Sequence, residues 1–210
     1  MLALAFECAG QGMHAALAEN GSLLAEKQVD MDRGQPAALL PFLHQLFADA
    51  GREVSDLDRV AVTRGPGGFT GIRLGLSVAL GLSRATGAAF FGCNAFDVYA
   101  LEQEDQVDLA VVIESRRKEL FFRCYDSKGE IVLSDAVLSP DDLNGREGFR
   151  FVGSAAETLD PAATNRPPNM ALLAAALSHT DAQPDWLRAA QDQSSPLYLR
   201  EPEIGAPKSA

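Results

Sequence analysis

Gly65-Pro66-Gly67-Gly68-Phe69-Thr70-Gly71-Ile72-Arg73 is the segment that decides the fold, because it joins a predicted strand directly to a predicted helix. Residues 60–63 have the β-branched content of a short buried strand, and residues 70–86 have the apolar spacing of a helix that ends at Gly87. A glycine-rich turn that opens a helix exposes backbone N–H groups at the positive end of the helix dipole, which suits an anion. The spacing matches neither a Walker A loop nor GxGxxG. A structural turn and a ligand-binding loop are therefore both open.

The predicted helix contains three glycines, Gly71, Gly75 and Gly81. Each costs about 1 kcal/mol relative to alanine in a helix interior, so we expect another backbone to approach the helix closely there. Arg73 lies in the first turn, where a cation opposes the helix dipole. We therefore expect Arg73 to have a carboxylate or phosphate partner.

The chain before this segment predicts three strands and a helix. The strands form an antiparallel meander over residues 2–6, 13–17 and 22–29. Residues 36–50 show the three- and four-residue apolar spacing of an amphipathic helix that ends at Gly51. Pro41 removes one backbone donor inside this helix and is expected to kink it.

The chain after the segment repeats the opening theme in a smaller copy. The predicted elements are a helix near residues 95–102, strands over 109–113, 120–125, 131–137 and 149–152, and a helix over 169–179. We therefore predict an α/β fold with an N-terminal lobe over residues 1–105 and a smaller C-terminal lobe over 106–210 that ends in a proline-containing tail.

The acidic net charge limits the kinds of partner that the protein can bind directly. Eighteen Lys and Arg against 29 Asp and Glu give a net charge of −11, and so acidic a surface repels phosphate backbones unless basic residues cluster. The run Arg116-Arg117-Lys118 is more typical of a solvated turn or strand edge than of a nucleic-acid site. Contact with RNA is therefore expected only through another subunit.

The cysteines and the N-terminal sequence indicate the cellular compartment in which we expect the protein. Cys8, Cys93 and Cys124 are far apart and form no CxxC pair, which fits a reducing environment. The sequence starts without a basic signal region, and no apolar run approaches the roughly 18 residues of a membrane helix. We expect a cytoplasmic protein that makes no contact with a membrane.

Two carboxylates are the main candidates for chemistry. Glu7 ends the first predicted strand and Glu114 ends the first strand of the second half, so both are expected to face a cleft between the lobes. Such a pair can hold Mg²⁺ or act as acid and base. With the amides of Gly67 and Gly68 on phosphate, the cleft would serve an ATP- and Mg-dependent phosphotransferase or phosphatase. The histidines lie in separate elements and form no helical metal pair.

The first two predicted helices have two interpretations. Either they only cover their own sheet, or their outer faces also form a groove for helices of another subunit. The helix over 70–86 is apolar over much of its circumference, which favours a partner. The predicted partner-contacting residues are Leu39, Phe42, Leu43, Leu46, Phe47, Gly71, Ile72, Arg73, Gly75, Val78, Ala79 and Leu82.

The stretch GPGGFTGIRLGLSVALGLS strongly resembles the glycine-rich loop and helix of the bacterial tRNA threonylcarbamoyladenosine biosynthesis protein TsaB (YeaZ) family. ALLPFLHQLF, IESRRKELFF and PLYLR are similar to three further segments of that family. The resemblance implies two actin-like (ribonuclease H-like) α/β lobes, the second reduced. It also implies a subunit without catalytic activity of its own.

In that family the subunit pairs with the catalytic paralogue TsaD and the ATPase TsaE, which transfer threonylcarbamoyl to the adenosine beside the tRNA anticodon. The resemblance further implies a homodimer when the subunit is alone, tRNA contact only through the complex, and no intrinsic cofactor. ATP or ADP with Mg²⁺ at a subunit interface is the one cofactor expectation. Both the heterodimer and the homodimer of the family use a bundle of the first two helices. We therefore expect Gly75→Leu or Leu46→Asp to abolish pairing while leaving the isolated chain folded.

The sequence departs from the family pattern at several positions. Glu7-Cys8 stands where the family usually has Asp-Thr, Gln35 where it often has His, Ala37 where it often has Glu, and Glu114 where it often has Asp. These departures weigh against a nucleotide site of the family type. The catalytic paralogue binds metal through paired histidines on its early helix, whereas this chain has Gln35 and His44 there, which favours a scaffold.

A peptidase is a further alternative, because that label has been attached to the family. The sequence contains no Ser-His-Asp pattern or zinc motif that supports it. Ser115 and Ser154 are better interpreted as turn residues. A non-catalytic partner subunit is therefore the leading expectation from the sequence.

Overall fold

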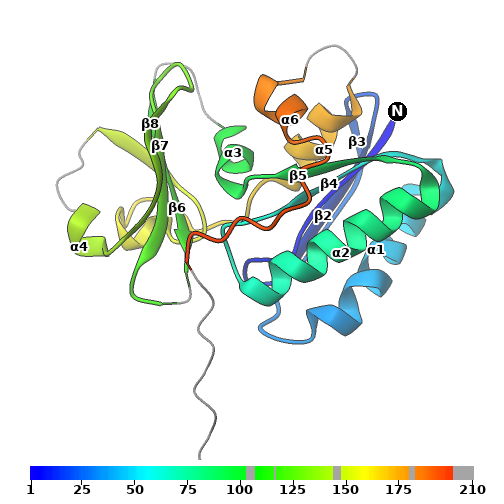
Figure 1. Ribbon diagram of the computed structural model, residues 1–210, viewed down its shortest axis with the longest axis horizontal. Helices are drawn as coiled ribbons and strands as arrows, with labels where there is room; N and C mark the ends of the chain where they lie inside the picture. The colour runs from blue at the N-terminus through cyan, green and yellow to red at the C-terminus, as the bar shows by residue number, and fades with distance from the viewer. Residues whose placement is uncertain (103–106, 116, 144–147, 180–182, 201–210) are drawn as a thin grey trace, which may run out of the picture.

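The computed structural model describes residues 1–102, 107–115, 117–143, 148–179 and 183–200. The chain forms two β-sheets that belong to two lobes, seen on the right and the left of Figure 1. Arg116 and the tail residues 201–210 lie outside the described residues. Within the described residues, no helix has both the length and the apolar character needed to cross a membrane.

The first sheet has the strand order β3-β2-β1-β4-β5. Its strands are β1 (Leu2–Glu7), β2 (Met13–Glu19), β3 (Ser22–Val29), β4 (Leu57–Thr63) and β5 (Ala89–Cys93). The antiparallel pairing of β1 with β2 and of β2 with β3 confirms the predicted meander. β4 then lies parallel to β1, and β5 lies parallel to β4.

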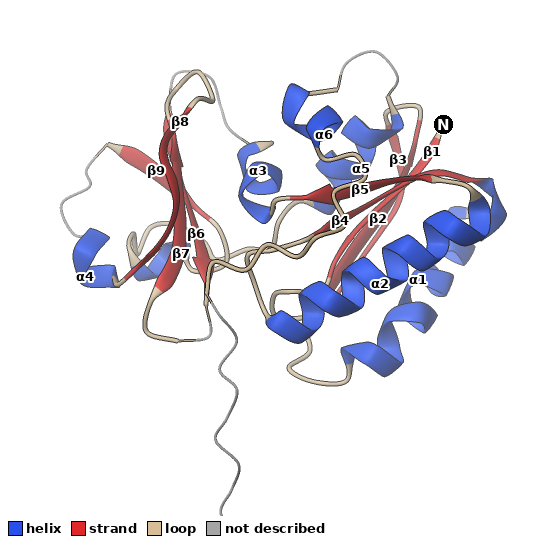
Figure 2. Ribbon diagram, viewed as in Figure 1, coloured by secondary structure: helices blue, strands red, loops and turns tan. Residues whose placement is uncertain are grey.

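The side chains of β1 point alternately to the two faces of the first sheet, and a different pair of helices packs on each face. Leu4 and Phe6 pack into the core beneath α1 (Gln35–Ala50) and α2 (Phe69–Thr86). Ala3 and Ala5 face the opposite side, where the alanine-rich helix α5 (Met170–Ser178) and α6 (Asp185–Ala189) pack. The small alanine side chains let α5 approach the sheet closely. Figure 2 shows the two helix pairs on opposite faces of this sheet.

Helix α1 continues through Pro41 to Ala50, so the proline does not end it. Pro41 lies on the exposed side of the helix. Gly51 ends α1 in the left-handed conformation, with φ of 63°, as the sequence predicts.

The second sheet repeats the order and direction of the strands β3-β2-β1-β4 of the first sheet and, among the described residues, has no counterpart of β5. Its order is β8-β7-β6-β9, with β6–β7 and β7–β8 antiparallel and β6–β9 parallel. The strands are β6 (Asp108–Glu114), β7 (Leu120–Tyr125), β8 (Ile131–Leu138) and β9 (Phe149–Val152). The short helix α4 (Pro140–Leu143) stands between β8 and β9, where the long α1 stands between β3 and β4. The expected smaller repeat is therefore present.

The predicted assignment of all of residues 106–210 to the second lobe needs correction. Helices α5 and α6 pack against the first sheet, with Leu173, Leu177 and Leu187 in its core. The chain thus returns to the first lobe after β9. The physical reason is that the alanine face of the first sheet needs a cover, and the apolar α5 supplies it.

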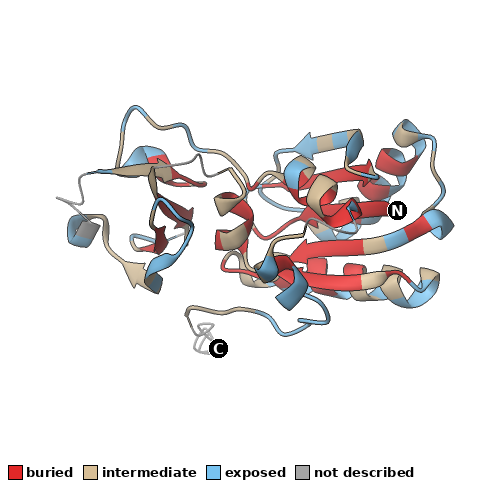
Figure 3. Ribbon diagram, turned by 90° about the horizontal axis from the view of Figure 1, so that it is seen from above, coloured by how far each residue is buried: buried red, intermediate tan, exposed pale blue. Residues whose placement is uncertain are grey.

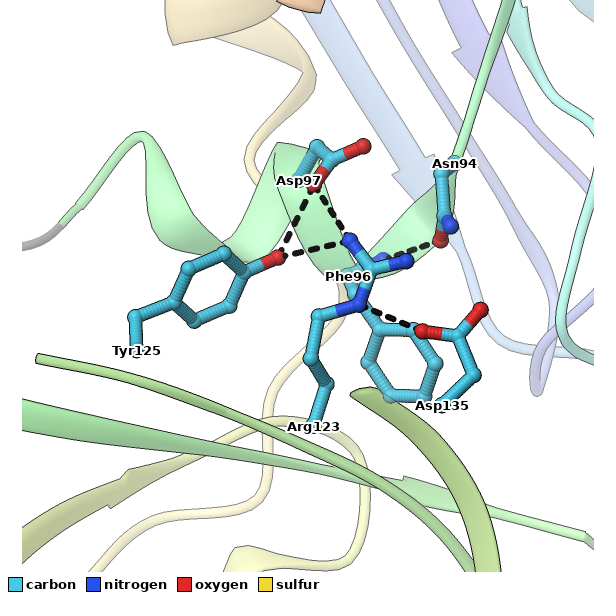
Figure 4. Close-up of polar contacts among 6 residues, drawn as sticks. All are labelled: Asn94, Phe96, Asp97, Arg123, Tyr125 and Asp135. Atoms are coloured by element: carbon cyan, nitrogen blue, oxygen red, sulfur yellow. Dashed lines mark hydrogen bonds and ion pairs between the residues drawn. The ribbon is translucent and has the colours of Figure 1, made fainter. Parts of the chain in front are cut away.

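Helix α3 (Ala95–Ala100) lies between the two lobes; Phe96 and Tyr99 pack against the second sheet, and Val98 packs in the core of the first lobe. A buried polar cluster fixes it there (Figure 4). The Arg123 guanidinium donates to Asp97 of α3 and to Asp135 of β8, each at 2.5 Å, and lies 5.0 Å from the centre of the Phe96 ring. The Tyr125 hydroxyl donates to Asp97 at 2.9 Å. Burial raises the pKa of the Asp97 carboxyl, and the charge of Arg123 opposes that rise.

Candidate functional site

The glycine-rich segment lies directly against the turn that joins β1 and β2. The Gly68 N–H donates to the Ala9 carbonyl oxygen at 2.7 Å. A Cβ on Gly71 would lie 2.0 Å from the Cys8 carbonyl oxygen, so only glycine allows the first turn of α2 to come so close. This is the close backbone approach that the sequence predicts for Gly71.

The other two helix glycines differ from each other. A Cβ on Gly75 would meet side chains, with Val62 Cγ2 at 3.0 Å and Cys8 Sγ at 3.2 Å. A Cβ on Gly81 would meet nothing within 4 Å. The expectation of a close neighbour is therefore wrong for Gly81 within this chain, because that residue lies on the exposed side of α2.

Arg73 has an aromatic environment in place of the expected carboxylate or phosphate. Its guanidinium carbon lies 3.8 Å from the centre of the Phe69 ring, and its Nε donates to the Tyr198 hydroxyl at 2.9 Å. The Phe69 and Tyr198 rings stack with centroids 5.0 Å apart. Stacking and one hydrogen bond thus accommodate the cation at the start of α2. The sequence could not indicate this, because Tyr198 follows Arg73 by 125 residues.

The structure brings the two candidate carboxylates to one interlobe cavity of about 220 Å³. Glu7 is buried, and its Oε1 accepts the N–H groups of Ala9 at 2.7 Å and Gly10 at 2.6 Å. Glu114 Oε2 accepts a hydrogen bond from Gln11 Nε2 at 2.6 Å. The cleft is therefore acidic, and a carboxylate of the chain already occupies amides in its β1–β2 turn.

Three backbone amides near this cleft already have acceptors within the chain. The N–H groups of Ala9 and Gly10 donate to Glu7 and the N–H of Gly68 donates to the Ala9 carbonyl oxygen, so these three amides are not available to a phosphate. Within the part of the chain that the structure describes, no group of three or more His, Cys, Asp or Glu side chains could hold a metal ion.

His14 also lines this cleft, which sequence reasoning did not anticipate. It lies opposite Glu7 in the β1–β2 register and is buried. Burial lowers its pKa, while Asp30 and a hydrogen bond with Gln28 oppose the decrease. The sequence signal for the position of His14 is the alternation of side chains along β2. This alternation places His14 on the same face of the strand as Ala16.

A larger cavity of about 510 Å³ lies at the start of α2. The glycine-rich segment forms one wall, Ser115 and Arg117 of the β6–β7 turn form a second, and residues 197–200 form a third. Arg200 forms an ion pair with Glu119 at 3.0 Å. The sequence did not indicate this cavity, because its walls come from three distant parts of the chain.

Cys8 lines the same cavity as a neutral thiol. Its Sγ donates to the Gly71 carbonyl oxygen at 3.3 Å. Burial raises its pKa to about 12, and the charge of Glu7 adds to the rise. A thiol of this kind is a poor nucleophile at neutral pH.

The two serines considered for a peptidase are engaged within the fold. The Ser115 hydroxyl donates to the Glu119 carbonyl oxygen across the β6–β7 turn. The Ser154 hydroxyl accepts the Glu114 N–H at 3.0 Å. Both therefore have the structural roles that the sequence suggests.

The structure narrows the predicted partner surface. The apolar pattern that predicts α1 and α2 is the same pattern that packs them onto the first sheet. Eight of the twelve residues are therefore buried in this chain, namely Leu39, Phe42, Leu43, Leu46, Phe47, Ile72, Gly75 and Ala79. Gly71, Val78 and Leu82 are half-buried and Arg73 is exposed, so these four remain within reach of a partner. Leu40, which is 59% exposed, was missed.

Two expected test variants need correction for the same reason. Leu46 has no exposed surface, so Leu46→Asp would bury an unpaired carboxylate. Gly75→Leu would force a large side chain against Val62 and Cys8. Both variants would test folding and would not isolate pairing.

The fold and the site define a class of protein. Two related sheets with an acidic cleft between them, the second lobe reduced, make this an actin-like (ribonuclease H-like) α/β protein. The chain belongs to the tRNA N6-adenosine threonylcarbamoyltransferase (TsaD) family, whose model matches residues 32–179.

Individual relatives agree with this assignment and with the expected resemblance to TsaB. The chain is 24% identical over 153 residues to the Escherichia coli tRNA threonylcarbamoyladenosine biosynthesis protein TsaB, covering 70% of this chain and 66% of that protein. It is 29% identical over 205 residues to an uncharacterized protein of Mycobacterium tuberculosis, covering 95% and 92%. The structure of YeaZ from Pseudomonas aeruginosa matches with a TM-score of 0.72 at 25% identity, covering 94% and 99%. Together they indicate a role in tRNA threonylcarbamoyladenosine biosynthesis.

Proposed function

We propose that this chain is a non-catalytic scaffold and activating subunit in tRNA threonylcarbamoyladenosine biosynthesis. Its partner is the catalytic tRNA N6-adenosine threonylcarbamoyltransferase of the same cell. The family match and the TsaB relatives support the pathway. The outer face of α1 and α2 supports the pairing.

One feature of α2 carries the proposal. Leu74, Val78 and Leu82 are spaced by four residues and are only half-buried, although they are apolar. Gly81 lies on the same face with open space above it. A small residue among apolar neighbours lets a second helix approach closely.

Helix α1 extends this surface. α1 and α2 lie on the same face of the first sheet (Figure 1). Leu40 and Pro41 are exposed on α1, and Ala37 is exposed one turn before Pro41. An exposed leucine next to a proline contributes apolar area that the isolated chain leaves in water. We define the pairing face as Leu40 of α1 with Leu74, Val78, Gly81 and Leu82 of α2.

The remaining parts of the proposal follow from this face and from the charge. The net charge of −11 repels tRNA, so the catalytic subunit makes the tRNA contact. The ATPase TsaE joins the same assembly, and the chain alone forms a homodimer through the pairing face. The assembly works in the cytoplasm.

An adenine nucleotide with Mg²⁺ at a subunit interface stays a prediction. The larger cavity suits a phosphate better than the acidic cleft, because Arg117 and Arg200 line it. ADP titrated into the chain alone and into the purified complex tests this prediction, with binding expected only in the complex.

Affinity capture from the native lysate tests the proposed function. The chain is captured, the bound proteins are identified by mass spectrometry, and the recovered complex is assayed for threonylcarbamoyl transfer to tRNA. Recovery of the catalytic threonylcarbamoyltransferase in an active complex is the expected result. A chain recovered alone that hydrolyses ATP with Mg²⁺, and loses this activity in Glu7→Gln, would favour the phosphotransferase alternative.

A further inference from the structure

Residues 195–200 cross from the first lobe to the second at the end of the described chain, seen as the red segment of Figure 1. We call this segment the interlobe strap. Viewed from above, it runs along one edge of the molecule, and most of it is exposed or half-buried (Figure 3). It has no regular secondary structure, so the contacts of its side chains and backbone determine its path.

The strap is anchored to the first lobe beside the glycine-rich segment. The Leu197 N–H donates to the Arg64 carbonyl oxygen at 2.7 Å, and Arg64 Nη1 donates to the Ser195 carbonyl oxygen at 3.1 Å. A Cβ on Gly65 would lie 2.4 Å from the Leu197 carbonyl oxygen. Gly65 has a φ of 113°, a conformation that favours glycine, so the loop is shaped to accept the strap.

Two consecutive strap residues pack into different lobes. Tyr198 packs against the core of the first lobe and stacks on Phe69. Leu199 packs against the core of the second lobe, which includes Phe121. Arg200 then pairs with Glu119 of the second lobe. The strap therefore connects the two cores within a few residues.

Helix α3 joins the two lobes, because Phe96 and Tyr99 pack in the core of the second lobe and Val98 packs in the core of the first. The Arg123 cluster fixes α3 to the second sheet through Asp97 and Asp135 (Figure 4). The backbone otherwise crosses between the lobes only at residues 93–95 and 153–169 of the described chain. Two backbone crossings can form a hinge, and a further contact between the lobes restricts it. The first-lobe anchor of the strap adjoins the first crossing, because the Arg64 N–H donates to the Cys93 carbonyl oxygen at 2.8 Å.

We propose that the interlobe strap fixes the angle between the two lobes and that its release opens the cleft between Glu7 and Glu114. The Gln11–Glu114 hydrogen bond also crosses this cleft, but it is exposed to solvent, so it restrains the hinge only weakly. The stacked Tyr198 and the packed Leu199 are the restraints that the strap adds to the contact of Val98 with the first lobe. The strap is thus a conformational device of the fold that acts independently of the pairing face.

Interlobe distance measurements by pulsed electron spin resonance test this proposal in the full chain. Spin labels on Ala189→Cys of the first lobe and Lys128→Cys of the second use exposed positions. The native cysteines are buried, which protects them from labelling. Dilution with unlabelled chain restricts the measurement to distances within one molecule.

The decisive variant is the double substitution Tyr198→Ala with Leu199→Ala, and Tyr198→Phe is the matched control. We expect one narrow distance in the parent chain and in Tyr198→Phe, which keeps the stacking. We expect the double variant to shift to longer distances with a broader distribution. An unchanged distribution in a double variant with a native circular dichroism spectrum would overturn the proposal.

A charge exchange decides the question if the double variant fails to fold. Arg200→Glu places two carboxylates together at the second-lobe anchor, and adding Glu119→Arg restores the pair in reverse. We expect the single variant to broaden the interlobe distance and the exchanged pair to narrow it again. The same narrow distance in both would overturn the proposal.

Discussion

Replacing Gly81 by leucine separates the pairing of α2 from the folding of the chain. The residue is exposed, and a Cβ there meets nothing within 4 Å. It lies inside the helix, which continues to Thr86. A larger side chain at this position therefore removes no contact within the chain.

Gly81→Leu should have opposite effects on the stability of the isolated chain and on its binding to the partner. An interior glycine costs a helix about 0.8–1.0 kcal/mol relative to alanine, and leucine is nearly as favourable as alanine. The isolated Gly81→Leu chain should therefore be more stable by somewhat under about 1 kcal/mol. At the centre of a helix-packing interface, the added side chain should weaken binding by at least about 2 kcal/mol, or roughly 30-fold in Kd.

Urea unfolding of the isolated chain measures the first effect, and calorimetric titration with the catalytic subunit measures the second. Gly81→Ala is the matched control, because it gains helix propensity while adding only a methyl group. A Gly81→Leu chain that binds with the parent Kd would refute the pairing face. A loss of stability would refute the reasoning about open space.

Three further substitutions test the site and its supports. Gly71→Ala places a Cβ 2.0 Å from the Cys8 carbonyl oxygen, so urea unfolding should show a net loss of roughly 2 kcal/mol, and an unchanged midpoint would contradict the close packing. The pKa of Cys8 is raised from 9.0 to about 12, so the unfolded chain loses this proton first as pH rises above 9. Stability should therefore fall by about 1.4 kcal/mol more between pH 8 and pH 10 in the parent than in Cys8→Ala, and parallel curves would contradict the raised pKa. Arg123→Met leaves Asp97 and Asp135 without their cation, so thermal unfolding should show a loss of about 3 kcal/mol, whereas an unchanged melting temperature would show that the cluster contributes little.

Local patterns predicted most of the elements. The strand alternation of β1 and β2 and the helical spacing of α1 and α2 are properties of neighbouring residues, and both sheets contain the predicted strands. The return of α5 to the first lobe could not be predicted, because no sequence feature of this alanine-rich helix indicates which of the two sheets it packs against. Its place depends on the small side chains of β1, far away in the chain.

The candidate site was predictable only in part. Glu7 and Glu114 stand at equivalent ends of repeated strands, which is why the sequence could place them in one cleft. The partner of Arg73 could not be found, because stacking on Phe69 and Tyr198 depends on the path of the C-terminal segment. The apolar periodicity of α1 and α2 identified the side of each helix that packs on the sheet. It could not by itself identify the outer side that is available to a partner.

The most direct test of the central claim is a reconstituted tRNA modification assay with and without this chain. The purified catalytic subunit, TsaE and tRNA are supplied with threonylcarbamoyl adenylate, and modified adenosine is quantified by mass spectrometry. We predict modification only when the chain is present, with a marked loss for Gly81→Leu and parent activity for Gly81→Ala. Equal modification with and without the chain would contradict its role as an activating subunit.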